Sequence, residues 1–189
     1  MRDGFVVHGA EGALGGALGT LLVKQGITLA RRMPEALKPP AVRRDPGEFV
    51  VSRLEALSGR ALPWGVHHRV AEGLHWAYGI TWGGLLGLAV AGLRVKTPRQ
   101  TLLAGAGMGA LVWAVGYVGW LPGAGLMQPI HRQGKGGVAT SLLSHVLYGV
   151  AASVPIALID RRRRRQRWWQ RLADTAGLGS SVVLERVGR

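Results

Sequence analysis

Two histidine residues carry the sequence pattern with the clearest chemical potential. His75 and His145 each begin a His-x-x-Tyr-Gly pattern, which ends at Gly79 in one copy and at Gly149 in the other. Imidazole titrates near neutral pH and ligates haem iron, so a histidine within an apolar helix is a candidate for proton or cofactor chemistry. The polar centre that we predict consists of Glu72, His75, Tyr78, Ser141, His145 and Tyr148.

Three roles for this histidine pair follow from the residues. The first is structural, with each imidazole hydrogen-bonded to tyrosine, serine or backbone across a helix interface. In the second, His75 and His145 are the cofactor-binding residues, two axial ligands of haem b held between helices, and the glycines four residues later leave room for the macrocycle. The third is a proton-responsive element that couples His75 to Glu72. No recognised spacing of ligands predicts a metal site.

The expected depth of the two histidines favours a shared level in the membrane. His75 is five residues from Val70 and His145 is seven from Val138. At 1.5 Å of rise per residue, both imidazoles lie roughly 8–11 Å from the same boundary. We therefore expect them to face each other.

Composition shows which elements must position these groups. The chain has 189 residues, 24 Lys+Arg against 10 Asp+Glu, a net charge of +14 and no cysteine, yet its mean hydropathy is +0.17. Charged and apolar residues are segregated along the chain, as in a polytopic membrane protein. The lack of cysteine excludes disulfides, cysteine-ligated zinc, iron–sulfur clusters and thiol catalysis. No catalytic motif is present, so we predict no catalytic residues and a non-enzymatic protein.

The apolar segments predict an all-α, integral membrane four-helix bundle. A bilayer-spanning helix needs about 20 mostly apolar residues. Glu11 and Lys24 fall within the first predicted span, where Lys24 can extend its ammonium group towards the headgroups. The predicted membrane domain covers 1–160, with spans at about 9–30, 70–93, 101–121 and 138–159.

The connection between the first two spans contains a predicted surface helix at about 46–58. Asp45 as N-cap, Pro46 at the first helical position and Glu48 at the third form a helix start, and Gly59 can end the helix. Its apolar residues gather on one side. We therefore expect an amphipathic helix on the membrane surface or capping the bundle.

Small residues at a spacing of four predict the packing faces of the spans. They let helix backbones approach closely in lipid. The stripes are His75/Gly79/Gly83/Gly87, Ser141/His145/Gly149/Ser153, Gly12/Gly16, Gly15/Gly19 and Gly105/Gly109. Together with the two His-x-x-Tyr-Gly patterns, they suggest two tandem helix–loop–helix repeats that run in the same direction.

Basic residues near the span ends predict the orientation. Arg161–Arg165 directly follow the last span, and Arg94, Lys96 and Arg99 crowd a tight loop. Positive charge favours the cytoplasmic side, so we expect cytoplasmic termini and a basic tail over 161–189. The predicted lipid-binding residues contact anionic headgroups, and no nucleic-acid partner is expected. These residues are Arg161, Arg162, Arg163, Arg164, Arg165, Trp168 and Trp169.

The order of these parts resembles the YagU-like family of small bacterial inner-membrane proteins. The features that carry the resemblance are the glycine-rich first span with its lysine, Pro39-Pro40, the Leu102–Ala106 opening of the third span, and His145 followed by the basic exit at Asp160–Arg165. The resemblance implies an inner-membrane location and a link to acid tolerance, and it supplies no catalytic residues. This chain departs from the family in having His-x-x-Tyr-Gly in both halves and a shorter loop before the last span.

The sequence therefore favours a small membrane protein with an accessory or stress-related role. The alternatives are a bis-histidine haem b electron carrier and a proton or small-solute transporter in which Glu72, His75 and His145 line a water-filled cavity. A homo-oligomer and a different membrane-protein partner both stay open.

Overall fold

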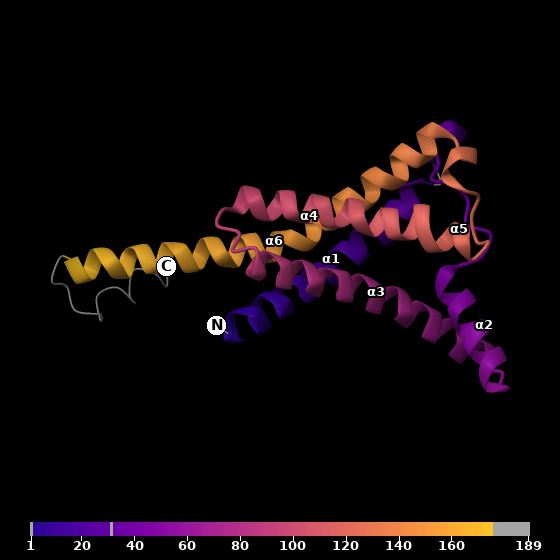
Figure 1. Ribbon diagram of the computed structural model, residues 1–189, viewed down its shortest axis with the longest axis horizontal. Helices are drawn as coiled ribbons and strands as arrows, with labels where there is room; N and C mark the ends of the chain where they lie inside the picture. Colours follow the sequence, from indigo (N-terminus) through magenta and orange to yellow (C-terminus); the bar gives the residue numbers. More distant parts are fainter. Residues whose placement is uncertain (1, 31, 176–189) are drawn as a thin grey trace.

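Every regular element in residues 2–30 and 32–175, which the computed structural model describes, is a helix (Figure 1). The prediction of an all-α protein is therefore confirmed for these residues, and positions 176–189 of the predicted tail lie outside them. The long helices are α1 (Arg2–Ala30), α3 (Trp64–Gly92), α4 (Pro98–Trp113) and α6 (Lys135–Thr175). The shorter elements are η1 (Glu35–Leu37), α2 (Pro46–Ser58), η2 (Ala114–Trp120), α5 (Leu121–Gly123) and η3 (Ile130–Arg132).

The long helices form two antiparallel pairs. α1 packs along α3, α4 packs along α6, and α1 also packs against α6, while α3 has few contacts with α4 or α6. The N-terminus of α1, the turn between α3 and α4, and the exit of α6 lie together, which we call the tail end (Figure 1). α2, α5 and the start of α6 lie at the opposite end, which we call the α2 end.

Glycines allow the helix backbones in both pairs to touch. A Cβ on Gly83 of α3 would overlap the backbone of Gly12 and Gly16 in α1, and a Cβ on Gly105 of α4 would overlap Gly149 in α6. Without a hydrophobic driving force between helices in lipid, such close backbone approach is a main source of association. The predicted glycine packing faces are confirmed at these positions.

Three helical segments are long and apolar enough to cross a membrane. They are Gly4–Ala30, Pro98–Gly123 and Lys135–Thr175, with mean hydropathies of 1.3, 1.6 and 1.9 over their most apolar stretches. This composition supports a membrane protein. α3 is 29 residues long but does not belong to this set, since its first half is polar and its second half is rich in glycine.

α2 begins and ends where the local signals predict. The Asp45 side chain accepts a hydrogen bond from the Glu48 backbone N–H at 3.0 Å, and Gly59 ends the helix at φ 66°. Gly47 lies against the backbone of Ala71 in α3, and Val51 is buried. α2 is therefore docked on the first half of α3, which leaves Leu54 and Leu57 exposed.

The apolar segment Pro98–Gly123 changes helix type in the middle. Thr97 caps α4 through a reciprocal capping box with Gln100, and after Trp113 the helix widens into the seven-residue π-helix η2. Such segments are rare, and they shift side chains relative to a regular α-helix. α6 instead runs for 41 residues from Lys135 to Thr175, through Pro155 and past Asp160, so the last predicted span and the arginine run form one continuous helix of about 60 Å.

Candidate functional site

The residues of the predicted polar centre that come from α3 do not converge. Glu72 accepts hydrogen bonds from Lys24 of α1 and from the Trp76 indole, the latter at 2.8 Å. His75 is exposed and has no hydrogen bond or ion pair with another described residue. Tyr78 is 41% exposed and meets Trp82 edge to face. The expectation that His75 faces the helix interface is therefore wrong.

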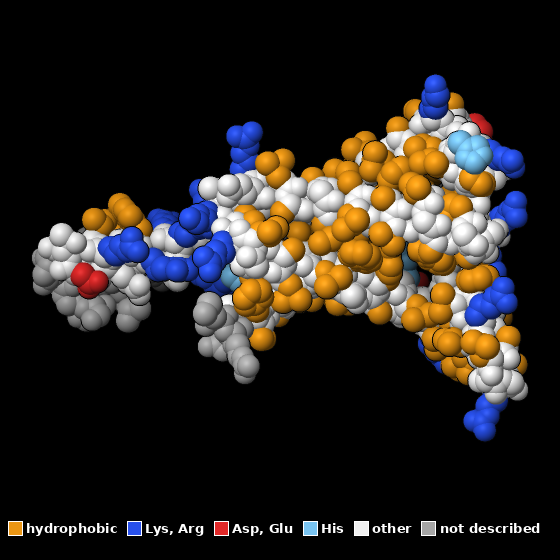
Figure 2. Space-filling model, viewed as in Figure 1, with side chains coloured by type: hydrophobic (Ala, Val, Ile, Leu, Met, Phe, Trp, Pro, Cys, Tyr) orange, Lys and Arg blue, Asp and Glu red, His pale blue; other side chains and the backbone are white. Residues whose placement is uncertain are grey.

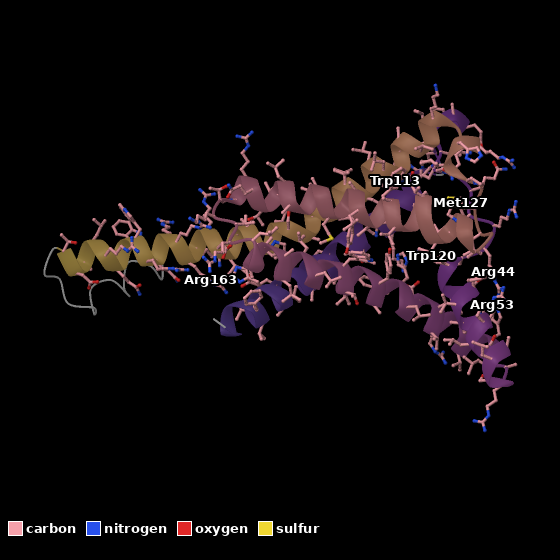
Figure 3. The ribbon with its side chains drawn as sticks, viewed as in Figure 1. Arg44, Arg53, Trp113, Trp120, Met127 and Arg163 are labelled. Atoms are coloured by element: carbon pink, nitrogen blue, oxygen red, sulfur yellow. The ribbon has the colours of Figure 1, made fainter. Side chains whose placement is uncertain are left out.

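The residues of the predicted centre that come from α6 are held by α4 and η2. The Ser141 hydroxyl accepts a hydrogen bond from the Trp113 indole at 2.9 Å, and the His145 Nδ1 lies 2.8 Å from the Ser141 carbonyl oxygen. The His145 ring packs edge-on against Tyr117, with 5.2 Å between ring centroids. Figure 3 labels Trp113, the last residue of α4, and Trp120, the last residue of η2. These contacts belong to the α4–α6 interface.

Tyr148 is the member of the predicted centre that joins the two helix pairs. Its side chain is buried, and its hydroxyl donates to the Gly79 carbonyl oxygen at 2.6 Å. The tyrosine of one His-x-x-Tyr-Gly pattern thus contacts the glycine of the other. This contact places α3 and α6 side by side at that level, but it does not bring the histidines together.

The arrangement does not fit haem b between His75 and His145. The glycines that would leave room for the macrocycle are already covered, Gly79 by Thr20 and Gly16 of α1, and Gly149 by Gly105 and Gly109 of α4. His75 is exposed, whereas His145 packs against Tyr117 at the α4–α6 interface. The haem prediction fails on this packing.

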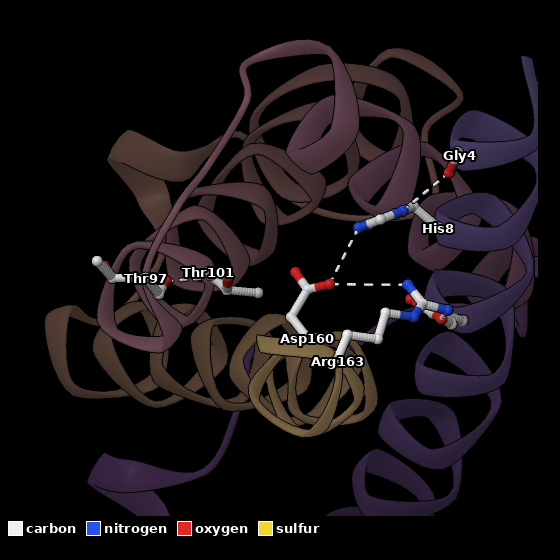
Figure 4. Close-up of polar contacts among 7 residues, drawn as sticks. Gly4, His8, Thr97, Thr101, Asp160 and Arg163 are labelled. Carbon is white, nitrogen blue, oxygen red and sulfur yellow. Dashed lines mark hydrogen bonds and ion pairs between the residues drawn. The ribbon is translucent and has the colours of Figure 1, made fainter. Parts of the chain in front are cut away.

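The tail end contains a cluster of four ionisable side chains between α1 and α6 (Figure 4). Arg163 donates to the Glu11 Oε1 at 2.5 Å, and its other terminal nitrogen lies 3.7 Å from the Asp160 Oδ1. The His8 Nε2 lies 3.4 Å from the same Asp160 oxygen. Glu11 is only 5% exposed, and its Oε2 has no hydrogen-bond partner among the described residues. We call this group the tail-end cluster.

Charged groups inside an apolar segment are costly, and they are candidates for function. Glu11 lies within the apolar segment Gly4–Ala30, and Arg163 links it to Asp160 and His8 at the place where α6 becomes basic. The cluster combines an imidazole and a guanidinium with two carboxylates, so groups of opposite charge type meet there. This cluster, and not the predicted polar centre, is the candidate functional site.

The α2 end has histidine–carboxylate pairs of another kind. The His67 Nδ1 lies 3.1 Å from the Glu55 Oε2, and the His68 Nδ1 lies 3.6 Å from the Glu48 Oε1. A hydrogen bond from the Leu62 backbone N–H and then the His67 side chain hold the pKa of Glu55 below its ordinary value. These pairs join α2 to α3 at the surface.

The predicted lipid-binding arginines divide into two groups. Arg161, Arg162, Arg164 and Arg165 are exposed, whereas Arg163 points inward to Glu11 and Asp160. Trp168 is 54% exposed and meets Trp169 edge to face. Arg163 is therefore removed from the predicted lipid-binding set, because its guanidinium is part of the tail-end cluster.

Sequence reasoning missed the tail-end cluster although its signals were present. Glu11 is an acidic residue within a predicted span, and such a group needs a partner. The predicted four-span topology puts the start of the first span and the exit of the last on the same side, so it places the arginine run near Glu11 as a source of positive charge. His8 and Asp160 carried no motif and could not be assigned without the contact between α1 and α6.

No metal-binding group of three or more histidine, aspartate or glutamate side chains is found among the residues that the structure describes. The comparisons with known proteins add no further assignment. Neither the known protein families, nor the curated proteins, nor the solved structures contain a match to this chain.

Proposed function

We propose that the chain is a four-span, non-enzymatic accessory protein of the bacterial inner membrane that holds a basic helix at the anionic headgroup layer. A stress-related role and membership of the YagU-like family are parts of this proposal. The observation that carries it is the continuity of α6, which runs from an apolar segment into the arginine run without a break.

The proposal includes α3 as the fourth span. Its glycine face touches the backbone of α1 at several levels. If α1 crosses the bilayer, α3 therefore crosses it alongside α1. Figure 2 supports this, since apolar side chains cover the middle of the molecule and Lys and Arg gather at its ends. The two helix pairs then correspond to the two tandem repeats of a four-helix bundle.

Positive charge supports cytoplasmic termini. The tail end combines Arg94 and Lys96 of the α3–α4 turn and Arg99 in the first turn of α4 with Arg161–Arg165. Short basic segments next to spans favour the cytoplasm. Because the chain has no cysteine, single cysteines test this directly. Gln166→Cys should react with a membrane-impermeant maleimide only in inside-out vesicles, and Gly134→Cys only in right-side-out cells. The reverse pattern would contradict the orientation.

The exposed residues of the arginine run suit anionic lipid. A basic side chain near an anionic surface contributes about 1 kcal/mol to binding, and tryptophan prefers the headgroup layer. Arg161, Arg162, Arg164 and Arg165 provide the charge, and Trp168 is exposed beside them. The partner that we propose is therefore the anionic headgroup layer itself.

The test is tryptophan fluorescence of the full chain in vesicles. The signal from Trp168 and Trp169 is the difference between the parent protein and a Trp168→Phe/Trp169→Phe variant. We expect this signal to shift to the blue when phosphatidylglycerol replaces part of the phosphatidylcholine, and the shift to vanish when the four exposed arginines become glutamine. Emission that is independent of phosphatidylglycerol would overturn the proposal.

A further inference from the structure

The contacts of the His8 ring favour its protonated form. Its Nδ1 lies 2.8 Å from the Gly4 carbonyl oxygen, and its Nε2 lies 3.4 Å from the Asp160 Oδ1. A carbonyl oxygen and a carboxylate only accept hydrogen bonds, while a neutral imidazole has a single N–H to donate. Only the imidazolium both donates to the Gly4 carbonyl oxygen and presents a positive charge to Asp160 at ion-pair distance.

The charge balance of the tail-end cluster favours the same form. Two carboxylates, Glu11 and Asp160, share the single guanidinium of Arg163. One negative charge is therefore uncompensated when His8 is neutral, in a place where the Glu11 and Asp160 side chains are only 7% and 14% exposed. Burying an uncompensated charge is unfavourable, and protonation of His8 removes it.

The other elements that pack here contribute no competing carboxylate among the described side chains. α3 meets this part of α1 through Gly87 and Leu88, which have no titratable group. From α4, Thr101 is buried and its hydroxyl donates to the Thr97 carbonyl oxygen. The remaining charges nearby are basic and exposed, and they oppose protonation of His8 weakly through water. They are Arg94, Lys96, Arg99, Arg161, Arg162 and Arg164.

We propose that the tail-end cluster is a proton-binding site in which protonated His8 joins the start of α1 to the base of the arginine run on α6. When His8 loses its proton, its ring can still donate to Gly4, but it loses the positive charge that faces Asp160. Asp160 then faces an unprotonated nitrogen beside a second carboxylate, and the contact between α1 and α6 weakens. This proposal goes beyond lipid binding, and it holds whether or not the arginine run contacts anionic lipid.

The experiment measures the distance between α1 and α6 as a function of pH. Two spin labels are placed on the cysteine-free chain through Gly4→Cys and Gln166→Cys, both exposed positions, in nanodiscs of phosphatidylcholine alone. Gly4→Cys keeps the backbone carbonyl that His8 contacts. Between about pH 5.5 and about pH 8.5, we expect the ratio of separated to joined states to rise about five- to tenfold, as expected for the loss of one partly buried ion pair.

Three variants in the doubly labelled chain distinguish a proton site from a structural contact. His8→Ala should give the separated distribution at both pH values, and the exposed His75→Ala is the matched control that should keep the parent response. Asp160→Asn should keep the helices joined at both pH values, because the asparagine amide can donate to a neutral His8. A parent distribution that is independent of pH, or a response that survives in His8→Ala, would overturn the proposal.

The ¹⁵N spectrum of the His8 ring reports its protonation directly and does not depend on helix motion. In the parent protein labelled with ¹⁵N-histidine, the signal that is absent from the spectrum of a folded His8→Gln variant belongs to His8. At about pH 5.5 we expect both of its nitrogens to be protonated, with one losing its proton by about pH 8.5. A ring that stays neutral at the lower pH would contradict the assignment.

Discussion

Each end of α1 is tied to another helix by an ion pair, and the two pairs differ in burial. At the tail end, the Glu11 and Arg163 side chains are 7% and 32% exposed. At the α2 end, Lys24 and Glu72 are 37% and 43% exposed. A buried pair is expensive to break, because the remaining charge lacks both partner and water. An exposed pair contributes little, because water replaces the partner.

The comparison indicates that the two ends of α1 serve different purposes. At the α2 end, Lys24 also lies over the Trp76 ring at 5.6 Å, an arrangement suited to a side chain at the edge of a membrane. The tail-end pair instead contains a carboxyl oxygen without a partner and a neighbouring histidine. An ion pair that only stabilises the fold needs neither the unpartnered carboxyl oxygen nor the histidine. Both features suit a proton-binding site.

The largest expected effect concerns the backbone contact that lies between the two ends. Gly83→Leu forces a side chain into the backbone of Gly12 and Gly16, so α1 and α3 must separate. We expect a loss of more than about 3 kcal/mol of unfolding free energy, measured as a lower unfolding temperature in detergent. Gly107→Leu on α4, where a Cβ meets nothing within 4 Å, is the control. Equal unfolding temperatures for the two variants would refute this packing.

The second prediction breaks the buried pair. Glu11→Gln leaves Arg163 with only the more distant Asp160, and we expect a loss of about 2 kcal/mol, reduced from a fully buried pair because Arg163 is partly exposed. Thermal unfolding of the single variants and of Glu11→Gln/Arg163→Gln gives the coupling between the two side chains. A double variant whose loss equals the sum of the single losses would show that the pair does not act as a unit.

Local signals predicted much of the fold. The bounds of α2 follow from Asp45, Pro46 and Gly59, which act within a few residues of the helix ends. The packing face of α3 follows from Gly79, Gly83 and Gly87, because backbone contact needs small residues. Neither inference needs knowledge of how the helices are placed relative to one another.

The candidate site could not be predicted in the same way. Residues four apart drift by about 40° at each step around a helix, so His75, three steps from Gly87, turns out of the face that Gly87 occupies. His145 stays against α4 because Gly109 lets that helix approach its backbone. The pairing of His8 and Glu11 with Asp160 and Arg163 depends on α1 lying against α6, which no local pattern specifies.

The third prediction concerns the exposed ion pair at the α2 end. Lys24→Gln or Glu72→Gln removes the exposed pair, and we expect a loss below about 1 kcal/mol, since water solvates the remaining charge. The measurement is the same thermal unfolding in detergent that is used for Glu11→Gln. If the Glu72→Gln loss matches the Glu11→Gln loss, the two ends of α1 do not differ as their burial indicates.

The smallest expected effect is a pH dependence at the α2 end. The Leu62 backbone N–H and His67 lower the pKa of Glu55, so its charged form stabilises the docked α2. This contribution is fully present above the ordinary carboxyl pKa of 4.5, and it is lost as the pH falls through the lowered pKa of the folded protein. Hydrogen exchange of 46–62, corrected for the intrinsic rate, should therefore speed up as the pH drops from about 5 to about 3.

Glu55→Gln separates this effect from general acid unfolding. Glutamine can still accept the Leu62 hydrogen bond, but it does not titrate, so exchange over 46–62 should be nearly independent of pH in this range. Glu35→Gln is the matched control and should follow the parent, because this carboxylate is 87% exposed and its one ion pair among the described residues is with Lys38. If Glu55→Gln follows the parent profile instead, the loosening of α2 arises from another group.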